Sequence, residues 1–353
     1  MYNEQRARLV HEAVAAGGGY NVGTPTRQLQ PGEATYLRNA RVSQGRIVPG
    51  KAPLGTNLWS TSEAIVDSFI FQTDTSKYLM MVGSRSVWNI ETGVTPVDLS
   101  PLPAFQAVVD PMWQHTSVLH QGVPAAVIHN RVDIPHKWQE GDGALQLITG
   151  APIMKTCLGF MGRLIGGGVY TGSAWHLNQL EWSGIDDIFD WSGLTWGTLP
   201  LPAEADPIQK LMQSRNNVML IFRADSIWGG YVTDQAQDPL SVEELFKVGC
   251  WSPNSVQAIP GAHLFLGKEA VYIVSPTGID NVSLGVRRDM FKRADPERTQ
   301  FAWSYVDRIA KEYYIAIVQL DGTQVLWCLN YEEGKWSSHD ATGITLLGDW
   351  YEI

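Results

Sequence analysis

"EYYIAIVQLDGTQVLWCLNYEEGKW", residues 312–336, consists of two apolar runs joined by a short polar turn. The turn contains Asp321 and Gly322, a pair that tolerates positive φ and is a strong signal for a β-hairpin. The second run carries an aromatic residue, Trp327. This stretch therefore predicts two antiparallel strands, and its pattern is the one that decides the fold.

Five other stretches follow the same plan of an apolar run, a polar turn such as "GSRS", "FRAD" or "LGKE", and a second run with an aromatic residue. They are residues 77–93, 124–143, 163–184, 217–232 and 262–278. A hairpin of this size cannot bury its own face, so repeated copies must stack on one another. The repeat predicts an all-β, β-propeller-like protein of about five to seven blades. A pair of β-sandwiches is the alternative, because the Gly-His and Trp-Asp signature of the commonest propellers is missing.

Composition agrees with a β-rich fold. The chain of 353 residues is 44% hydrophobic and 18% charged, with 34 Gly, 19 Pro and 14 Trp, which fits many short strands joined by tight turns. The three cysteines are an odd number, lie far apart in apolar surroundings and form no Cys-x-x-Cys pair. We therefore expect Cys157, Cys250 and Cys328 to be buried free thiols.

A short helix is predicted at the N-terminus. Residues 3–16 place Leu9, Val10 and Val14 on one face at helical spacing, and Gly17 to Gly19 end the pattern. The predicted organisation is an N-terminal helical arm with a Gly hinge at residues 1–30, followed by a β-propeller-like domain at residues 31–353. We expect the apolar face of the arm to dock on another subunit.

A second short helix is predicted inside the β-rich region. In "SVEELFKV", residues 241–248, Ser241 is followed three residues later by Glu244, which is the spacing of a capping box.

The charge of the chain argues against a broad nucleic-acid-binding surface. Its formal net charge is −10, whereas proteins that grip phosphates are normally basic. An acidic wall would instead let DNA pass without adhesion. The basic stretch "GVRRDMFKRADPERTQ", residues 285–300, is interpreted as a solvated loop or a salt-bridging surface, with a DNA brake as the alternative. The absence of a long apolar run predicts no membrane insertion and synthesis in a cytoplasm.

Catalytic and cofactor motifs are missing from the sequence. It has no Gly-x-Ser-x-Gly, no phosphate loop and no His-Glu-x-x-His. The glycine run "LIGGGVY", residues 164–170, has no following lysine and predicts a strand bend or a contact between blades. The histidines, such as His115 and His120, lack metal-ligand spacing, so we expect neither a metal nor a cofactor.

"NQLEWSGIDDIFDWSG", residues 178–193, has two interpretations. The acids Glu181, Asp186, Asp187 and Asp190 could provide the carboxylate pair of a glycosidase, with the tryptophans stacking on sugar. Alternatively, the aspartates and glycines form turns, since apolar residues alternate with them. The second interpretation is favoured because nothing elsewhere supplies a second catalytic element, and the protein is expected not to be an enzyme.

The segment "LEWSGIDDIFDWS" resembles a recurring line of the nozzle, or packaged-DNA-stabilisation, proteins of short-tailed bacteriophages and related tail-hub propellers. That line has the form Arg-x-x-Trp-Ser-Asp-x-Gly-Asp-x-x-Asp-Trp. The matching residues are Trp182, Ser183, Asp186, Asp187, Asp190 and Trp191. Gly184 departs from the pattern where the family often has Asp, and Asp187 or Ile188 stands where its Gly-Asp usually occurs.

The N-terminal stretch "GGGYNVGTPTRQLQPGEATYLRNARVSQGRIVPGKAP", residues 17–53, is similar to the entry segment of the same proteins. The matching residues are Gly32, Glu33, Ala34, Asn39, Gly45, Ile47 and Gly50. The residues themselves predict a hairpin, with a strand from Asn39, a turn at 43–45 and a returning strand at 46–48. With the terminal "LNYEEGKWSSH", these phrases cover about a quarter of the chain.

The resemblance implies a virion structural protein, namely a ring-forming subunit of a phage tail nozzle or head-to-tail conduit that lines or closes the DNA exit channel. It implies a homo-oligomeric ring, with six copies as in the family, that contacts an adaptor or portal-proximal ring and tail fibres. DNA would pass transiently without specific binding. The alternatives are a carbohydrate-binding or glycan-hydrolysing propeller that binds a receptor, and a cellular scaffold propeller.

Overall fold

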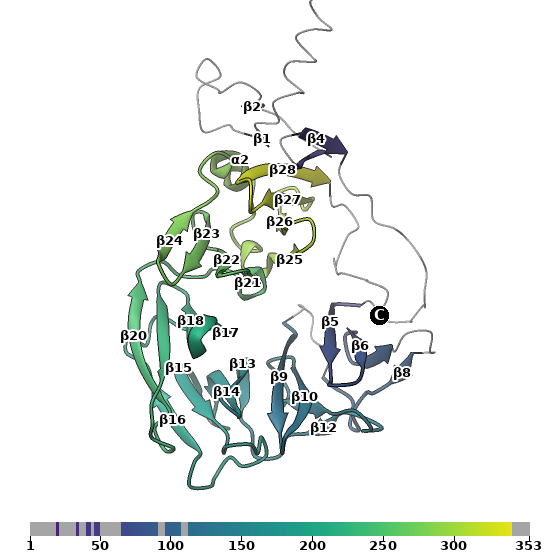
Figure 1. The fold of residues 1–353 in the computed structure, drawn as a ribbon, viewed down its shortest axis with the longest axis vertical. Coiled ribbons are helices and arrows are strands. Elements are labelled where there is room, and N and C mark those ends of the chain that lie inside the picture. The colour runs from purple at the N-terminus through teal and green to yellow at the C-terminus, as the bar shows by residue number, and fades with distance from the viewer. Residues whose placement is uncertain are drawn as a thin grey trace, which may run out of the picture. The chain divides into compact units, whose positions relative to one another are not determined.

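The computed structural model describes residues 19–20, 33–34, 40–43, 46–49, 65–90, 96–106 and 112–340. Within these residues the chain forms six four-stranded sheets, each made of four consecutive strands paired in chain order (Figure 1). Every neighbouring pair within the six sheets is antiparallel. Six such meanders in succession are the blades of a β-propeller.

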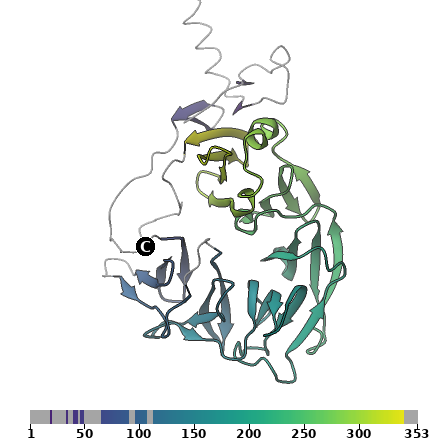
Figure 2. The same ribbon diagram turned by 180° about the vertical axis from the view of Figure 1, so that it is seen from behind.

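Four blades belong to one compact unit within residues 57–250. The first two blades comprise β5 (Asp67–Gln72), β6 (Lys77–Val82), β7 (Val87–Ile90), β8 (Val97–Asp98), β9 (Gln114–His120), β10 (Val123–His129), β11 (His136–Trp138) and β12 (Gln146–Leu147). The next two comprise β13 (Ile153–Phe160), β14 (Arg163–Tyr170), β15 (Trp175–Trp182), β16 (Gly197–Pro200), β17 (Ile208–Gln213), β18 (Val218–Arg223), β19 (Ile227–Val232) and β20 (Leu240–Phe246). Figure 2 shows these four blades from behind, following one another in chain order.

The other two blades belong to a second compact unit, which includes residues 251–347 and the short strands near the N-terminus. These blades comprise β21 (Gln257–Ile259), β22 (Ala262–Leu266), β23 (Val271–Ser275), β24 (Gly278–Asn281), β25 (Trp303–Asp307), β26 (Glu312–Val318), β27 (Gln324–Asn330) and β28 (Lys335–Asp340). The short strands are β1 (Gly19–Tyr20), β2 (Glu33–Ala34), β3 (Ala40–Ser43) and β4 (Arg46–Pro49). Strands β3 and β4 form the predicted antiparallel hairpin, and β1 pairs with β2 in parallel.

The all-β propeller prediction is confirmed, and the six blades fall within the predicted range. Each of the six repeated stretches forms the second and third strands of one blade, from β6–β7 to β26–β27. Asp321 and Gly322 make the turn between β26 and β27, where Gly322 has a φ of 80°. These central strands are apolar along most of their length, and in β14 the neighbouring blades cover both faces of the strand.

The first strands of consecutive blades approach one another closely. The amide of Gly159 in β13 donates to Oγ1 of Thr116 in β9 at 3.0 Å. The amide of Leu211 in β17 likewise donates to Oγ1 of Thr156 in β13 at 3.2 Å. Two threonines at corresponding positions thus join three blades through their inner strands.

The helix predicted at residues 241–248 is wrong. This segment lies in β20, which pairs with β19 along most of its length. Val242 packs against the core between blades, whereas Ser241, Glu243 and Glu244 are exposed on the outermost strand. Pairing with the free edge of β19 satisfies more backbone groups than the one capping-box interaction would, so tertiary structure overrides the local helix signal.

The basic stretch at residues 285–300 contains a short helix, α2 (Arg287–Lys292), instead of the expected loop. Met290 anchors the helix because its side chain is fully buried in the core around β22 and β26. The five cations of the stretch are exposed, and two of them pair with acids, Arg287 with Glu269 at 2.8 Å and Arg298 with Asp295 at 3.8 Å.

The prediction for the cysteines is confirmed. The three cysteines are buried and free. No helix in this part of the chain has the length and apolar character needed to cross a membrane. The proposed N-terminal arm, with Leu9, Val10 and Val14, lies outside the described residues, so the division into an arm and a propeller domain stays a prediction.

Candidate functional site

The stretch that resembles the phage proteins forms the connection between β15 and β16, here called the signature loop (residues 183–196). Ser183 fixes its start, because its hydroxyl accepts the amide proton of Leu164 and donates to the carbonyl of Gly184, both at 3.0 Å. A bridge between Gly184 and Asp187 then folds the chain back on itself. The loop is thereby held against β14 from its first residue.

Two aspartates of the signature loop shape turns. Oδ1 of Asp187 accepts the amide proton of Phe189 at 2.9 Å, and Oδ1 of Asp190 accepts that of Gly193 at 2.7 Å. The backbone carbonyl of Asp190 also accepts the amide proton of Gly184 at 2.7 Å. These are the local hydrogen bonds by which aspartates stabilise turns.

Asp186 links the signature loop to the turns of two neighbouring hairpins. Its φ is 54°, a left-handed conformation that Asp tolerates better than most residues. Its amide donates to the carbonyl of Gly162, and its carbonyl accepts the amide proton of Gln121, at 2.7 and 2.9 Å. Gly162 has a φ of 69°, a left-handed conformation that favours glycine, and a Cβ there would also lie 2.6 Å from Oδ1 of Asp186. Asp186 is therefore a joint between two blades.

The two tryptophans of the signature sequence point into different blade interfaces. Trp182 is 1% exposed and belongs to the core that includes Ile208 and Leu211 of the following blade. Trp191 belongs to the core that includes Val118 of the preceding blade, and its Nε1 donates to the carbonyl of Ile188 at 2.7 Å. Trp182, at the end of β15, and Trp191, in the signature loop, thus join their own blade to both neighbours.

Arg163 is a further anchor that sequence reasoning missed. Its guanidinium is buried and donates to three carbonyl oxygens, those of Ser183 at 2.8 Å, Ala236 at 2.6 Å, and Thr195. Burial lowers the pKa of Arg163 below its usual range. The arginine connects both ends of the signature loop to the β19–β20 connection, and no sequence motif marks it for this role.

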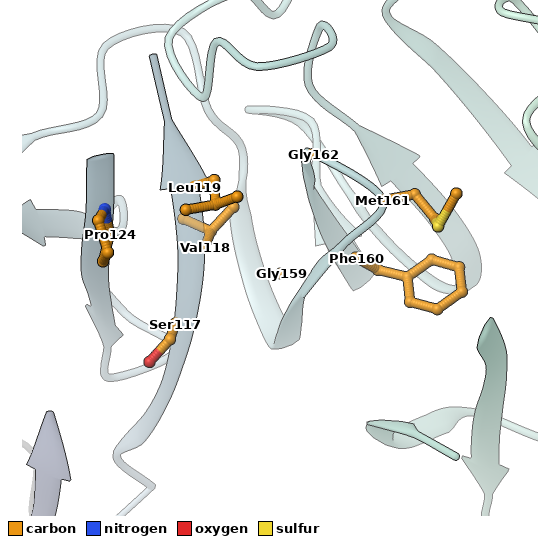
Figure 3. A pocket seen from close by; sticks show the side chains of 8 residues that line it. All are labelled: Ser117, Val118, Leu119, Pro124, Gly159, Phe160, Met161 and Gly162. Atoms are coloured by element: carbon orange, nitrogen blue, oxygen red, sulfur yellow. The ribbon is translucent and has the colours of Figure 1, made fainter. Parts of the chain in front are cut away.

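A pocket of 260 Å³ adjoins this region, between β9 and the turn joining β13 to β14 (Figure 3). Its lining consists of Ser117, Val118, Leu119, Pro124, Gly159, Phe160, Met161 and Gly162. None of these residues has a titratable side chain, so the lining offers no general acid or base for a reaction.

A separate feature of the same blade favours the sugar-binding interpretation. Glu181 is buried, and its Oε1 accepts a hydrogen bond from Nε1 of Trp196 at 3.2 Å. Burial raises the pKa of Glu181, although the Trp196 hydrogen bond and His176 act in the opposite direction. Trp196 is 36% exposed and Trp175 is 40% exposed. The β13–β16 blade thus carries a carboxyl of raised pKa beside one partly exposed tryptophan, Trp196, whereas Trp175 lies at the other end of β15.

Most of the other predicted site residues cannot be compared with the structure. Glu33 is the first residue of β2, whereas Gly32, Asn39, Gly45 and Gly50 lie outside the described residues. In the part of the chain that is described, no group of three or more His, Cys, Asp or Glu side chains has the arrangement of a metal site. The glycine run at 164–170 contains a register shift between Gly167 and Val169, and a Cβ on Gly167 would meet Ile208 at 2.9 Å. That run is both a strand bend and a blade contact, as predicted.

Replacing Asp190 with alanine should destabilise the protein by about 0.5–2 kcal/mol, because the amides of Ser192 and Gly193 lose their acceptor. Chemical denaturation measures this loss. Asp234→Ala, at an exposed acid in the β19–β20 connection, is the control and should change stability by less than about 0.5 kcal/mol. Equal stability of the two variants would show that Asp190 does not hold the turn.

Comparisons with known proteins identify the fold only. No protein-family model matches the sequence, and no curated protein matches it. Among solved structures, the extracellular domain of a one-component system from B. thetaiotaomicron has a TM-score of 0.52 at 11% identity, covering 81% of this chain and 35% of that one. This chain thus spans about a third of that structure's length.

Two further similarities are weaker. The WD40 repeats of RRP9 have a TM-score of 0.48 at 10% identity, with 81% of this chain and 83% of that chain covered. Puromycin hydrolase has a TM-score of 0.46 at 10% identity, with 86% of this chain and 49% of that chain covered. At these identities the similarity is one of fold, and propellers serve many unrelated functions.

Proposed function

We propose that this chain is a virion structural protein, a ring-forming subunit of a phage tail nozzle or head-to-tail conduit. The observation that carries the proposal is that the residues matching the phage pattern all have structural roles. Asp187 and Asp190 form turns, Asp186 joins two hairpins, and Trp182 and Trp191 fill two different blade interfaces. Each of these residues supports a turn or the packing between blades. This is what we expect of a motif that recurs for structural reasons.

The charge of the chain supports a conduit that does not adhere to DNA. The sequence contains 36 Asp and Glu against 26 Lys and Arg, so several copies around a channel would present a strongly negative wall. Such a wall repels phosphates over roughly 8–10 Å at physiological salt. The most basic stretch, residues 285–300, is partly neutralised by its pairs with Glu269 and Asp295.

Imaging of assembled particles tests this proposal directly. Virions of the phage that encodes the chain, resolved by cryo-electron microscopy, should show it as a closed ring on the axis of the tail. Six copies are expected from the family. Absence of the chain from purified virions, or its presence away from the tail axis, would refute the structural role.

Purified protein should bind duplex DNA very weakly, even at low salt where attraction to a basic patch is strongest. Fluorescence anisotropy with labelled duplex across a salt series measures this. The decisive variant carries Arg287→Gln, Arg288→Gln and Arg293→Gln. Salt-sensitive binding that disappears in that variant would replace the passive wall with a DNA brake.

Glu181 and its partly exposed neighbour Trp196 support a second candidate, a carbohydrate-binding or glycan-hydrolysing propeller. A carboxyl of raised pKa is what a glycosidase uses as general acid, and exposed aromatic rings stack on sugars. Incubation with a glycan panel, with Glu181→Gln as the matched variant, separates the two candidates. Hydrolysis that is lost in Glu181→Gln would favour the enzyme over the conduit.

A further inference from the structure

Three basic side chains lie near the same end of the strands within residues 57–250. Lys155 and Lys210 are each the third residue of an inner strand, β13 and β17, and Arg131 follows β10 by two residues. Nε of Arg131 donates to the carbonyl of Lys155 at 2.7 Å, and Nη1 of the same guanidinium lies 2.7 Å from Sδ of Met112. Arg131 is thereby fixed between two blades.

Arg131 and Lys210 are poorly neutralised by the surrounding protein, whereas Nζ of Lys155 lies over the ring of Trp175, 5.8 Å from its centroid. Burial lowers the pKa of Arg131 to about 10, and no carboxylate among the described residues offsets this. Burial, together with the charge of Arg131, lowers the pKa of Lys210 to about 8. Asp67 acts on Lys210 in the opposite direction, but its carboxylate already lies 3.5 Å from Nδ1 of His115.

Two buried polar side chains of the β9–β10 pair, of which His129 is within electrostatic reach of Arg131 and Lys210, lack hydrogen-bond partners. Gln114 is 3% exposed and His129 is 1% exposed, and neither the amide of Gln114 nor the ring of His129 makes a hydrogen bond of normal geometry. The two residues are directly opposite in the β9–β10 pairing, so their side chains share one face of the blade. Buried polar groups of this kind are costly unless a ligand or water satisfies them.

His129 is also electrically linked to the basic cluster. Burial lowers its pKa well below the usual value, and the charges of Arg131 and Lys210 act in the same direction, whereas the backbone of Met154 opposes them. The imidazole is therefore neutral at pH 7 and keeps one N–H to donate. The cluster contains several donors and few acceptors.

We infer that Arg131, Lys155 and Lys210, with the amide of Gln114 and the ring of His129, form a binding site for a tetrahedral oxyanion. The chemical class is a phosphoryl or sulfate group, because a fixed guanidinium fork and two ammonium groups suit an anion with several oxygens. Such an anion supplies the missing negative charge and the missing acceptors together. The inference is independent of the role proposed for the chain in a virion.

Isothermal titration of the full chain with sodium sulfate, against sodium chloride of equal ionic strength, tests the site. Wild-type protein should bind sulfate specifically, and Lys210→Met should weaken binding at least about tenfold, the effect of losing one charge-assisted contact. Lys247→Met removes an exposed lysine next to β20 and should leave affinity unchanged. Equal affinity in both variants, or no sulfate binding by wild type, would overturn the inference.

The pH dependence and the ligand series provide further readouts. Sulfate keeps its charge between pH 7 and 9, so affinity should fall over this range as Lys210, whose pKa is about 8, loses its proton. The groups whose charges act on Lys210 are Arg131, Asp67, Cys157 and Cys250. Inorganic phosphate and a nucleoside monophosphate are then compared, since tighter binding of the nucleotide identifies a phosphoryl group carried by a larger molecule and equal binding identifies a free anion.

A folding defect is separated from a binding defect by two measurements. Without anion, Lys210→Met should melt at or above the temperature of wild type, because it removes a cation that lies near Arg131. Gln114→Leu, which leaves all three cations in place, should also weaken sulfate binding. Wild-type affinity in Gln114→Leu would contradict the part of the site assigned to Gln114, just as wild-type affinity in Lys210→Met would contradict the whole site.

Discussion

Gly159→Ala should destabilise the protein by about 3 kcal/mol or more, because the added Cβ has no space. That atom would lie 2.1 Å from the carbonyl oxygen of Ser117 and 2.9 Å from Cβ of Val118, both in the neighbouring blade. The obstacle is backbone, so no side-chain rotation relieves it. Strands β9 and β13 would have to separate, and the hydrogen bond from the Gly159 amide to Thr116 would be lost.

Gly143→Ala is the matched control for this substitution. Gly143 is exposed, and a Cβ there would meet nothing within 4 Å. Its change in stability should stay within about 1 kcal/mol, since only the conformational freedom of the chain is altered. Guanidinium denaturation of both variants and wild type provides the comparison. If Gly159→Ala proves as stable as Gly143→Ala, the close approach of β9 and β13 is wrong.

The central hairpins of the blades could be predicted because burial on both faces leaves an apolar signal in the sequence. The outer strands left no comparable signal. Strand β16 reads "GTLP" and alternates between half-buried and exposed positions, and β20 carries a helix-like capping pattern. In such strands the hydrogen bonds to the neighbouring strand determine the structure, and those partners lie elsewhere in the chain.

The signature loop likewise combines local contacts, which the sequence can predict, with contacts between distant residues, which it cannot. The turns of Asp187 and Asp190 depend on residues two and three positions away, so their role could be inferred from sequence. The contacts of Asp186 involve Gln121 and Gly162, which belong to other hairpins. Which distant residues meet depends on how the blades stack, and no short motif encodes that.

The cluster of three basic residues could not be predicted from the sequence for the same reason. Arg131, Lys155 and Lys210 occur in three separate repeats of an acidic chain, and none forms part of a charge run. They converge because each stands near the same end of its blade. A propeller thus gathers residues that recur at the repeat period, and only the pairing register shows which ones.

The second large effect is expected at Asp206, which holds the buried Arg223. The guanidinium of Arg223 is fully buried, and its Nε lies 3.5 Å from Oδ2 of Asp206. The same carboxylate accepts the amide proton of Asp225 at 2.7 Å and the hydroxyl of Ser226 at 2.5 Å. Burial lowers the pKa of Arg223, whereas the charge of Asp206 raises it. The acid therefore stabilises the charged guanidinium and the β18–β19 turn.

Asp206→Ala should cost about 3–5 kcal/mol, because it removes the larger of two counter-charges of a buried cation and leaves only the exposed carboxylate of Glu244. The carbonyls of Asp206 and Ala203, which accept from Nε and Nη2 at 2.7 and 2.6 Å, satisfy hydrogen bonds but carry no net charge. Chemical denaturation of the full chain measures the loss, with Asp234→Ala as the surface control.

The double variant Asp206→Ala with Arg223→Met distinguishes a charge effect from a turn effect. A buried ion pair can often be replaced by apolar residues at little net cost, so removing the cation as well should recover much of the stability lost in Asp206→Ala. The part not recovered measures the hydrogen bonds to Asp225 and Ser226. The double variant could instead be less stable than Asp206→Ala. In that case Arg223 stabilises the β17–β20 blade mainly through its hydrogen bonds to carbonyls and its position over the ring of Trp228, 5.5 Å from the centroid, and the charge of Asp206 is secondary.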